Sequence, residues 1–241
     1  MKIVALSDIH GSLINNIPEC DVVCICGDIL PLQVQRSVVK SVSWLCQDFK
    51  PWAESLPCKH VIFIAGNHDF VFETLGPKAG KRPHEVMIEI FGEHHLKKSK
   101  LIYLRDESTT IEGVKFYGTP WCPELKNWAF YKCQSDLIDV YNGIPSNTDI
   151  LLTHCPPKIN NLGVVLQDGI NYLRDFGSEE LAAILLDKPF IKWVLSGHIH
   201  SGDHNIVRSG LTNLVNVSIK DENYNVKYQP FIFEYEKRKN N

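Results

Sequence analysis

Five short clusters of metal-binding residue types are spread along this chain of 241 residues. They are Asp8-Ile9-His10, Gly27-Asp28, Gly66-Asn67-His68-Asp69, Thr153-His154 and Gly197-His198-Ile199-His200. A donor set that mixes carboxylate, amide and imidazole groups suits Mn²⁺, Fe, Zn²⁺ or Ni²⁺ better than the oxygen-rich shells typical of Mg²⁺ or Ca²⁺. The residue types therefore predict a site for borderline transition-metal ions.

The first three clusters suggest different roles for their members. Asp8 and His10 are two residues apart, so in an extended backbone their side chains point to one face and can chelate one cation. Asp28 follows a glycine that allows close approach, and its two carboxylate oxygens can bridge two cations. If Asn67 faces the metal with its amide oxygen, the adjacent His68 faces the substrate. His68 is the candidate acid or oxyanion stabiliser.

Three histidines, His154, His198 and His200, complete a donor set large enough for two metal ions. Two cations about 3.5 to 4 Å apart lower the pKa of a bridging water and offset negative charge at phosphorus, which is the chemistry of phosphate ester hydrolysis. His68, oriented by Asp69, would stabilise the developing charge or protonate the leaving oxygen. A lone Asp-x-His or Gly-Asp is common by chance, whereas five clusters in this order are not.

Each cluster directly follows a short apolar run, which places all five at strand ends. The runs are residues 2–7, 22–26, 61–65, 150–153 and 193–196. Nearly continuous apolar runs rich in β-branched residues are typical of strands buried on both faces. Because loops beyond the strand ends of layered α/β proteins carry ligands, we expect all five clusters to meet at one sheet edge.

Helices and further strands are expected between these runs. Residues 35–56 carry apolar side chains at helical spacing, with Pro51 expected to end or kink the helix, and shorter helices are expected at 83–91, 135–141 and 178–186. Further strands are expected at 101–104, 110–111, 114–117, 214–217 and 227–235, with a hairpin turn at Glu112-Gly113. Two sheets sharing one core and covered by helices would accommodate them.

Composition predicts one domain over residues 1–236, followed by a frayed polar tail at 237–241. The net charge of -3 and the pI of about 6.4 disfavour duplex nucleic acid and anionic lipid as partners. Apolar runs are too short to span a bilayer, and Asp8 interrupts the N-terminal one. The eight cysteines form no CxxC pair. We therefore expect a soluble, cytoplasmic protein with reduced thiols.

In their order from residue 8 to residue 200, the five clusters resemble those of the calcineurin-like metallophosphoesterase family. The resemblance implies a four-layer α-β-β-α sandwich, in which two mixed β-sheets are flanked by helices and a binuclear centre lies at the strand ends. It also implies catalysis through a metal-bridging hydroxide, with His68 as the catalytic histidine. By the family pattern, the first metal would be held by Asp8, His10, Asp28 and His200, and the second by Asp28, Asn67, His154 and His198.

One departure from the family pattern is that many members continue Gly-Asp-x-x-Asp, whereas here Asp28 is followed by Ile29, Leu30 and Pro31. No assigned ligand is lost by this change. Within the family, the segments 118–121 and 153–157 and the small size are similar to the compact branch of metallophosphoesterase-domain-containing proteins. That branch implies a phosphodiesterase of 2′,3′-cyclic nucleotides or aryl diesters supported by Mn²⁺.

Several alternatives remain open at this point. A phosphomonoesterase or protein phosphatase-like activity, or a weakly active regulatory scaffold that binds metal or nucleotide, would use the same ligands. Trp121 and Trp128 either stack on a base or aryl group or pack in the core. Cys122 and Cys155 either touch the metal site or are buried structural thiols. His204 either lines the substrate side or has no part in the site.

Overall fold

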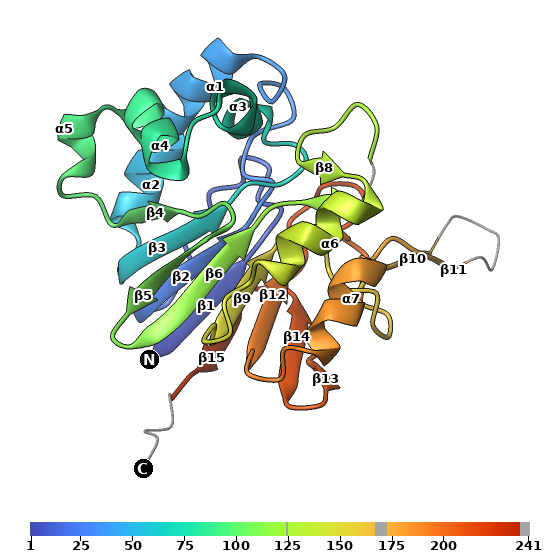
Figure 1. Ribbon diagram of the computed structural model, residues 1–241. Helices are drawn as coiled ribbons and strands as arrows, with labels where there is room; N and C mark the ends of the chain where they lie inside the picture. The colour runs from blue at the N-terminus through green and yellow to red at the C-terminus, as the bar shows by residue number, and fades with distance from the viewer. Residues whose placement is uncertain (124, 167–172, 237–241) are drawn as a thin grey trace.

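Two large β-sheets lie face to face at the centre of the molecule, as seen in a computed structural model that describes residues 1–123, 125–166 and 173–236 (Figure 1). The first sheet has five strands in the order β15-β1-β2-β3-β4, and the second has six in the order β13-β14-β12-β9-β6-β5. The predicted polar tail at 237–241 lies outside the described residues.

The first sheet is parallel except at one edge. It contains β1 (Lys2–Leu6), β2 (Cys20–Cys26), β3 (Cys58–Ile64) and β4 (Leu101–Tyr103), which run parallel, and β15 (Phe231–Glu234), which pairs antiparallel with β1. The pairing of β15 with β1 brings the start and the end of the described chain into one sheet. This agrees with one domain over residues 1–236, a boundary that stays a prediction.

The second sheet has a parallel centre and an antiparallel strand at each edge. Its centre consists of β6 (Val114–Thr119), β9 (Ile150–Thr153), β12 (Trp193–Ser196) and β14 (Thr212–Asn216), and its edges are β5 (Glu107–Ile111) and β13 (Val207–Ser209). Glu112 and Gly113 form the predicted hairpin turn between β5 and β6, with φ of 48° and 82°. Both sheets are therefore mixed, as expected.

Alternate residues of each strand face different layers. In β1, Ile3 and Ala5 pack in the core between the sheets, together with Phe116 of the second sheet. Val4 and Leu6 belong to the other core cluster, which contains the helix residues. β1 is thus buried on both faces, which explains why it reads as a continuous apolar run rather than as an alternating one.

Helices cover the outer face of each sheet (Figure 1). The first sheet is covered by α1 (Val38–Trp44), a π-helical segment (Leu45–Phe49), α2 (Lys50–Ser55), α3 (Phe70–Leu75), a 3-10 turn (Pro77–Ala79), α4 (Pro83–Phe91) and α5 (Glu93–Leu96). The second is covered by α6 (Gln134–Asn142) and α7 (Glu179–Leu186). The result is the expected arrangement of two mixed sheets between helical layers.

The structure differs from expectation in a few elements. The helix predicted over 35–56 begins at Val38 after the Ser37 cap, and it continues past Pro51 because the π-helical segment widens the preceding turn. The strand predicted over 227–235 is limited to β15. Two short ladders were not predicted, namely β7 (Cys122–Pro123) with β8 (Tyr131–Lys132) and β10 (Val164–Leu166) with β11 (Leu173–Asp175). Strands this short carry no readable periodicity.

Across the described ranges of the chain, no helix combines the length and the apolar character required to cross a membrane.

Candidate metal centre

The five predicted clusters meet where their strands end. Asp8 and His10 follow β1, Asp28 follows β2, and Asn67 with His68 follows β3. The remaining histidines come from the second sheet, with His154 after β9 and both His198 and His200 after β12. Apart from His198, each predicted ligand is at least nine-tenths buried. Polar side chains from the strand ends of both sheets thus lie together in one buried cluster.

Asp28 lies at the middle of this cluster. One of its carboxylate oxygens, Oδ2, is 3.6 Å from Nε2 of His10, 3.4 Å from Nε2 of His154 and 3.8 Å from Nε2 of His68. Asp8 has its Oδ1 3.6 Å from Nε2 of His200. Three groups of donor atoms here lie within 4.8 Å of one another, namely Asp8 with His10 and His200, Asp8 with Asp28 and His154, and His10 with Asp28 and His68. Asp28 is therefore placed to serve both predicted metal positions.

The second predicted position adds Asn67 and His198 to this arrangement. Oδ1 of Asn67 lies 2.9 Å from Nε2 of His154, so the two expected donors point to one place. The rings of His154 and His198 have centroids 5.0 Å apart. The structure thus brings all seven predicted ligands together.

Backbone carbonyls fix the ring nitrogens that face the centre. Nδ1 of His154 donates to the carbonyl oxygen of Cys26 at 2.8 Å, and Nδ1 of His200 donates to that of Asp221 at 3.0 Å. Such bonds direct Nε2 of each ring toward the centre, where it can serve as a metal donor once deprotonated. His10 has both ring nitrogens buried without a hydrogen-bond partner in the described part of the chain, and the nearest carboxylate oxygen, Oδ2 of Asp28, is 3.6 Å from Nε2. Because an unpaired buried nitrogen is costly, a cation bound there fits these residues.

Sharp turns in the backbone create this convergence. Asp8, His10, Asp28 and His198 have positive φ values of 56°, 39°, 52° and 69°. The extended backbone expected from Asp8 to His10 is therefore wrong. The chain turns as β1 ends, since the amide of Asp8 donates to the carbonyl of Gly27 and that of His10 to the carbonyl of Asp28, each at 3.0 Å.

Glycines allow the loops to approach closely. A Cβ at Gly66 would lie 2.2 Å from Oδ1 of Asp28, and one at Gly197 would lie 2.5 Å from Oδ2 of Asp8. Both distances are shorter than any allowed contact. The close packing of the ligand loops therefore requires glycine at both positions.

Charges in the metal-free cluster are unevenly distributed. Burial opposes ionisation of Asp8, but the hydrogen bond and charge of His200 lower its pKa to about 2. Burial lowers the pKa of His10 to about 4 and that of His198 to about 3. Burial also acts to lower the pKa of His154, but the Asp28 carboxylate raises it to about 10. Two carboxylates thus remain ionised beside a protonated His154, an arrangement suited to attracting cations.

His68 has a partner that the sequence did not reveal. Its Nδ1 lies 2.6 Å from Oε1 of Gln35, and its backbone amide donates to Oδ1 of Asp28 at 2.8 Å. The side of its ring packs against Trp128, with centroids 4.3 Å apart. The Gln35 oxygen accepts a hydrogen bond from Nδ1, so Nε2 is the nitrogen that faces the site. No local signal in the sequence indicates this contact, because Gln35 and His68 are 33 residues apart in the chain.

Asp69 has a different task from the one predicted. Its fully buried carboxylate accepts hydrogen bonds from the backbone amides of Ile29 and Leu30, each at 3.0 Å, and of Gly66 at 2.8 Å. The expectation that it orients His68 is therefore wrong, because Gln35 occupies that place. Asp69 instead joins the loop that follows β2 to the loop that follows β3.

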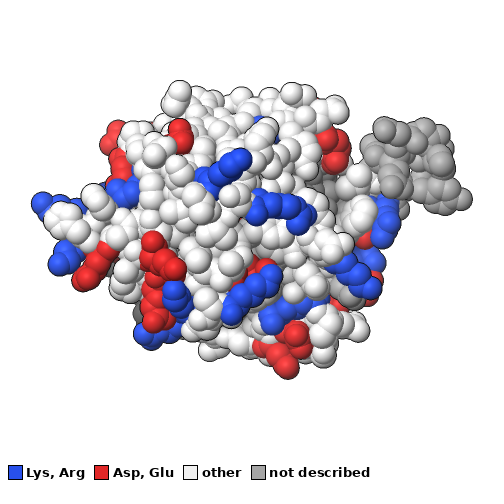
Figure 2. Space-filling model, turned by 90° about the horizontal axis from the view of Figure 1, so that it is seen from above, with Lys and Arg blue, Asp and Glu red and all other residues white. Residues whose placement is uncertain are grey.

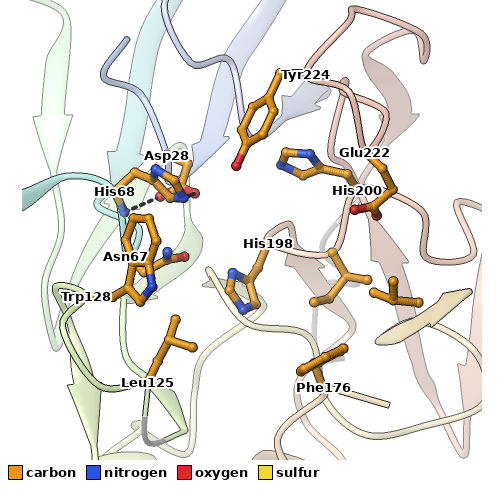
Figure 3. A pocket seen from close by; sticks show the side chains of 12 residues that line it. Asp28, Asn67, His68, Leu125, Trp128, Phe176, His198, His200, Glu222 and Tyr224 are labelled. Atoms are coloured by element: carbon orange, nitrogen blue, oxygen red, sulfur yellow. Dashed lines mark hydrogen bonds and ion pairs between the residues drawn. The ribbon is translucent and has the colours of Figure 1, made fainter. Parts of the chain in front are cut away.

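A cavity of about 360 Å³ opens beside the centre (Figure 3). Its described lining comprises Asp28, Asn67, His68, Leu125, Trp128, Val165, Phe176, His198, Ile199, His200, Glu222 and Tyr224. Figure 3 shows Leu125 and Phe176 on the side of the cavity away from Tyr224. Sequence reasoning missed Glu222 and Tyr224, since neither belongs to a metal-binding cluster.

The structure shows where the residues lie whose roles the sequence did not decide. Trp128 lines the cavity, whereas Trp121 is buried and donates from Nε1 to Asp106 at 2.7 Å. Cys122 has its thiol within 4.8 Å of donor nitrogens of two predicted ligands, His154 and His198. His204 stacks on Tyr228 with centroids 3.7 Å apart and does not belong to the described lining.

The buried thiol of Cys155 lies 3.5 Å from the backbone carbonyl oxygens of Pro156 and Phe176. This contact agrees with a structural thiol.

Comparison with known proteins identifies the family to which this fold and this site belong. The family model described as calcineurin-like phosphoesterase matches residues 1–202. The chain therefore belongs to the calcineurin-like phosphoesterase family. Members of this family typically bind two divalent metal ions, and the Asp and His groups described above provide donors for them.

Named relatives cover nearly the whole chain. A UPF0046 protein of Caenorhabditis elegans is 28% identical over an alignment of 251 positions that covers 97% of this chain and 60% of that protein. Metallophosphoesterase domain-containing protein 1 of Homo sapiens is 28% identical over 248 residues, covering 97% of this chain and 70% of that protein. The chain thus spans less than two thirds of the length of the first of these relatives.

Solved structures show the same fold at low identity. The phosphopantetheinyl hydrolase from Mycobacterium tuberculosis is 14% identical, with a TM-score of 0.50 over 92% of this chain and 90% of that one. A second solved structure is 12% identical, with a TM-score of 0.61 over 89% of each chain. These likenesses support the fold alone.

Proposed function

We propose that the protein hydrolyses small phosphodiesters, including cyclic or other nucleotides. The lining of the cavity carries this proposal, because its described part contains no Lys or Arg and has the Glu222 carboxylate at its rim. A phosphomonoester carries a second negative charge that Glu222 would repel, whereas a diester does not. The apolar side chains of Leu125, Trp128 and Phe176 offer a surface for the second ester group.

The ligands would be divided between two ions, for which we propose manganese. Asp8, His10, Asp28 and His200 would hold the first, and Asp28, Asn67, His154 and His198 the second, since the mixed donor set suits Mn²⁺ and tolerates Fe, Zn²⁺ or Ni²⁺. When bound, the ions supply an activated water and neutralise charge on the phosphate oxygens. The chain itself supplies the shared Asp28 carboxylate and the orientation of each imidazole.

We infer that His68 donates a proton to the leaving group. Gln35 holds Nδ1, so Nε2 faces the site and, when protonated, can donate to the departing ester oxygen. Acid catalysis of this kind contributes about 10² to 10⁴ in rate. Trp128 packs against the ring and limits its rotation.

The surface charge and the free cysteines agree with a small substrate and with a reducing compartment. Figure 2 shows Lys and Arg interspersed with Asp and Glu on the face viewed from above, and the net charge is -3. Duplex nucleic acid requires a basic surface, so we do not propose it as a partner. Free thiols at all eight cysteines fit the cytoplasm, which we propose as the location.

The proposal is tested with protein stripped by a chelator and reloaded with Mn²⁺. We expect kcat/KM for bis(4-nitrophenyl) phosphate to exceed that for 4-nitrophenyl phosphate by at least about tenfold, given the charge difference at Glu222. His68→Ala should retain its metal content and lose about 100-fold in turnover. Preference for the monoester would indicate a phosphomonoesterase, and no turnover of either ester or of 2′,3′-cyclic AMP would indicate a metal-binding regulatory protein.

A further inference from the structure

A loop near the C-terminus reaches over the metal centre from outside the part of the chain that matches the family model. The match ends at residue 202, and the loop is closed by a bridge between Lys220 and Val226. At its tip, the ring of Tyr224 lies 5.0 Å from the rings of His10 and His200 and 6.4 Å from that of His68, measured between centroids. Tyr224 thus covers three histidines of the site.

Hydrogen bonds hold the loop in one conformation. The Asp221 carboxylate accepts from the amides of Asn223 and Asn225, each at 2.9 Å. The ammonium group of Lys220 donates to the carbonyl of Tyr224 at 2.9 Å and to the hydroxyl of Ser12 at 2.5 Å. These bonds support Tyr224 in a left-handed backbone conformation with φ of 61°, which is unfavourable for a bulky residue and is found at positions with a specific task.

The same loop is tied to the predicted metal ligands. The carbonyl of Asp221 accepts from Nδ1 of His200 at 3.0 Å, and Glu222 accepts from the amide of Ser201 at 2.9 Å. The position of the loop is therefore linked to the orientation of one metal-binding ring. A side chain on this loop keeps a fixed place relative to the metal centre.

The Tyr224 hydroxyl is free to contact a ligand. Figure 3 shows it pointing from the ring into the cavity, and no other described residue forms a hydrogen bond with it. A tyrosine hydroxyl is a neutral donor at neutral pH. It can therefore bind an anionic oxygen without adding a positive charge, in a cavity whose described lining contains no Lys or Arg.

We propose that Tyr224 is a substrate-binding residue whose hydroxyl donates a hydrogen bond to a phosphate oxygen of the bound diester. The proposal rests on the phosphodiesterase function proposed above and names a residue beyond the family match. Glu222, two residues earlier on the same loop, disfavours a phosphate group that carries a second charge. One loop would thus both bind the phosphate of a diester and select against a monoester.

The test compares Tyr224→Phe with Tyr228→Phe, a matched control whose ring stacks on His204 and is not among the described lining residues. Phe keeps the ring of Tyr224 and removes only its hydroxyl. We expect Tyr224→Phe to lower kcat/KM for bis(4-nitrophenyl) phosphate by about 10- to 100-fold, the loss expected for one hydrogen bond to a charged oxygen. Tyr228→Phe should match the parent protein.

A second measurement does not depend on turnover. Calorimetric titration of the Mn²⁺-loaded proteins with inorganic phosphate should show at least about fivefold weaker binding to Tyr224→Phe and tighter binding to Glu222→Gln, since the latter removes a repelling charge. If the parent protein hydrolyses neither ester, the proposed function fails, and phosphate binding still decides the role of Tyr224. Unchanged phosphate affinity at equal metal content, or loss of metal from Tyr224→Phe, would overturn the proposal.

Discussion

Replacing Asp69 tests whether this carboxylate supports the site or acts in catalysis. In Asp69→Ala, three buried backbone amides, those of Ile29, Leu30 and Gly66, lose their acceptor. An unsatisfied buried donor costs about 1–3 kcal/mol. Burial and the nearby Asp28 carboxylate raise the pKa of Asp69 to about 7, so removing it also relieves repulsion and offsets part of the loss.

The net effect should be a large loss of stability. We expect Asp69→Ala to lower the free energy of unfolding of the metal-free protein by about 3–5 kcal/mol, which corresponds to about 10 °C in Tm for a chain of this length. Asp69→Asn keeps one oxygen acceptor but turns an amide group toward one of the three donors, so it should cost about 1–3 kcal/mol. Asp136→Ala is the control, because Asp136 is exposed and lies 3.9 Å from Lys132.

The assay is thermal and urea unfolding in the presence of chelator, followed by metal titration of each variant. Because Asp69 joins the loops that carry Asp28 and Asn67, Asp69→Ala should also bind metal more weakly. If Asp69→Ala unfolds within about 1 kcal/mol of the parent protein and binds metal normally but does not turn over, the reasoning is refuted. That outcome would restore the catalytic role first expected for Asp69.

Three other predictions concern the centre itself. Asp28→Asn should reduce metal content from two ions towards none, because its Oδ2 lies within 3.8 Å of Nε2 of His10, His154 and His68; unchanged stoichiometry by mass spectrometry would count against the shared ligand. Gln35→Ala should retain metal but lose about tenfold in kcat, with recovery in Gln35→Glu, since either acceptor can hold Nδ1 of His68. His154 has a pKa of about 10 without metal, so metal binding at pH 7 should release a proton and tighten as pH rises. Calorimetry in buffers of different ionisation enthalpy measures that proton, and a pH-independent affinity would contradict it.

The sequence was most informative where signals are local. Apolar runs predicted the strands β1, β2, β3, β9 and β12, because a strand buried on both faces must be apolar throughout. The clusters at their ends predicted which side chains meet, since parallel strands end at a common edge. For the same reason, the seven ligands could be named before their distances were known.

The sequence was least informative where partners are distant in the chain. Gln35 reaches His68 across 33 residues, and the carbonyl of Asp221 reaches His200 across 21. Nothing in the local pattern of either segment indicates such contacts, because a hydrogen bond between loops depends on how the whole sheet is packed. Asp69 was misread for the same reason, since its carboxylate accepts from the amides of Ile29 and Leu30, 40 and 39 residues away, rather than from the adjacent His68.

Hydrogen bonds between the loops, rather than contacts with a metal ion, hold the ligand residues in position. Left-handed backbone costs an average residue about 1 kcal/mol or more, and Asp and His, which stand at positions 8 and 10, adopt it more often than most residues do. The cost is offset by bonds between loops, such as those from the amides of Asp8 and His10 to the Gly27–Asp28 turn and from the amide of His198 to the Asp8 carboxylate at 3.0 Å. The donor and the acceptor of each of these bonds belong to the protein itself. Loss of metal and loss of stability should therefore be separable, and replacing a histidine ligand should lower the free energy of unfolding less than Asp69→Ala does.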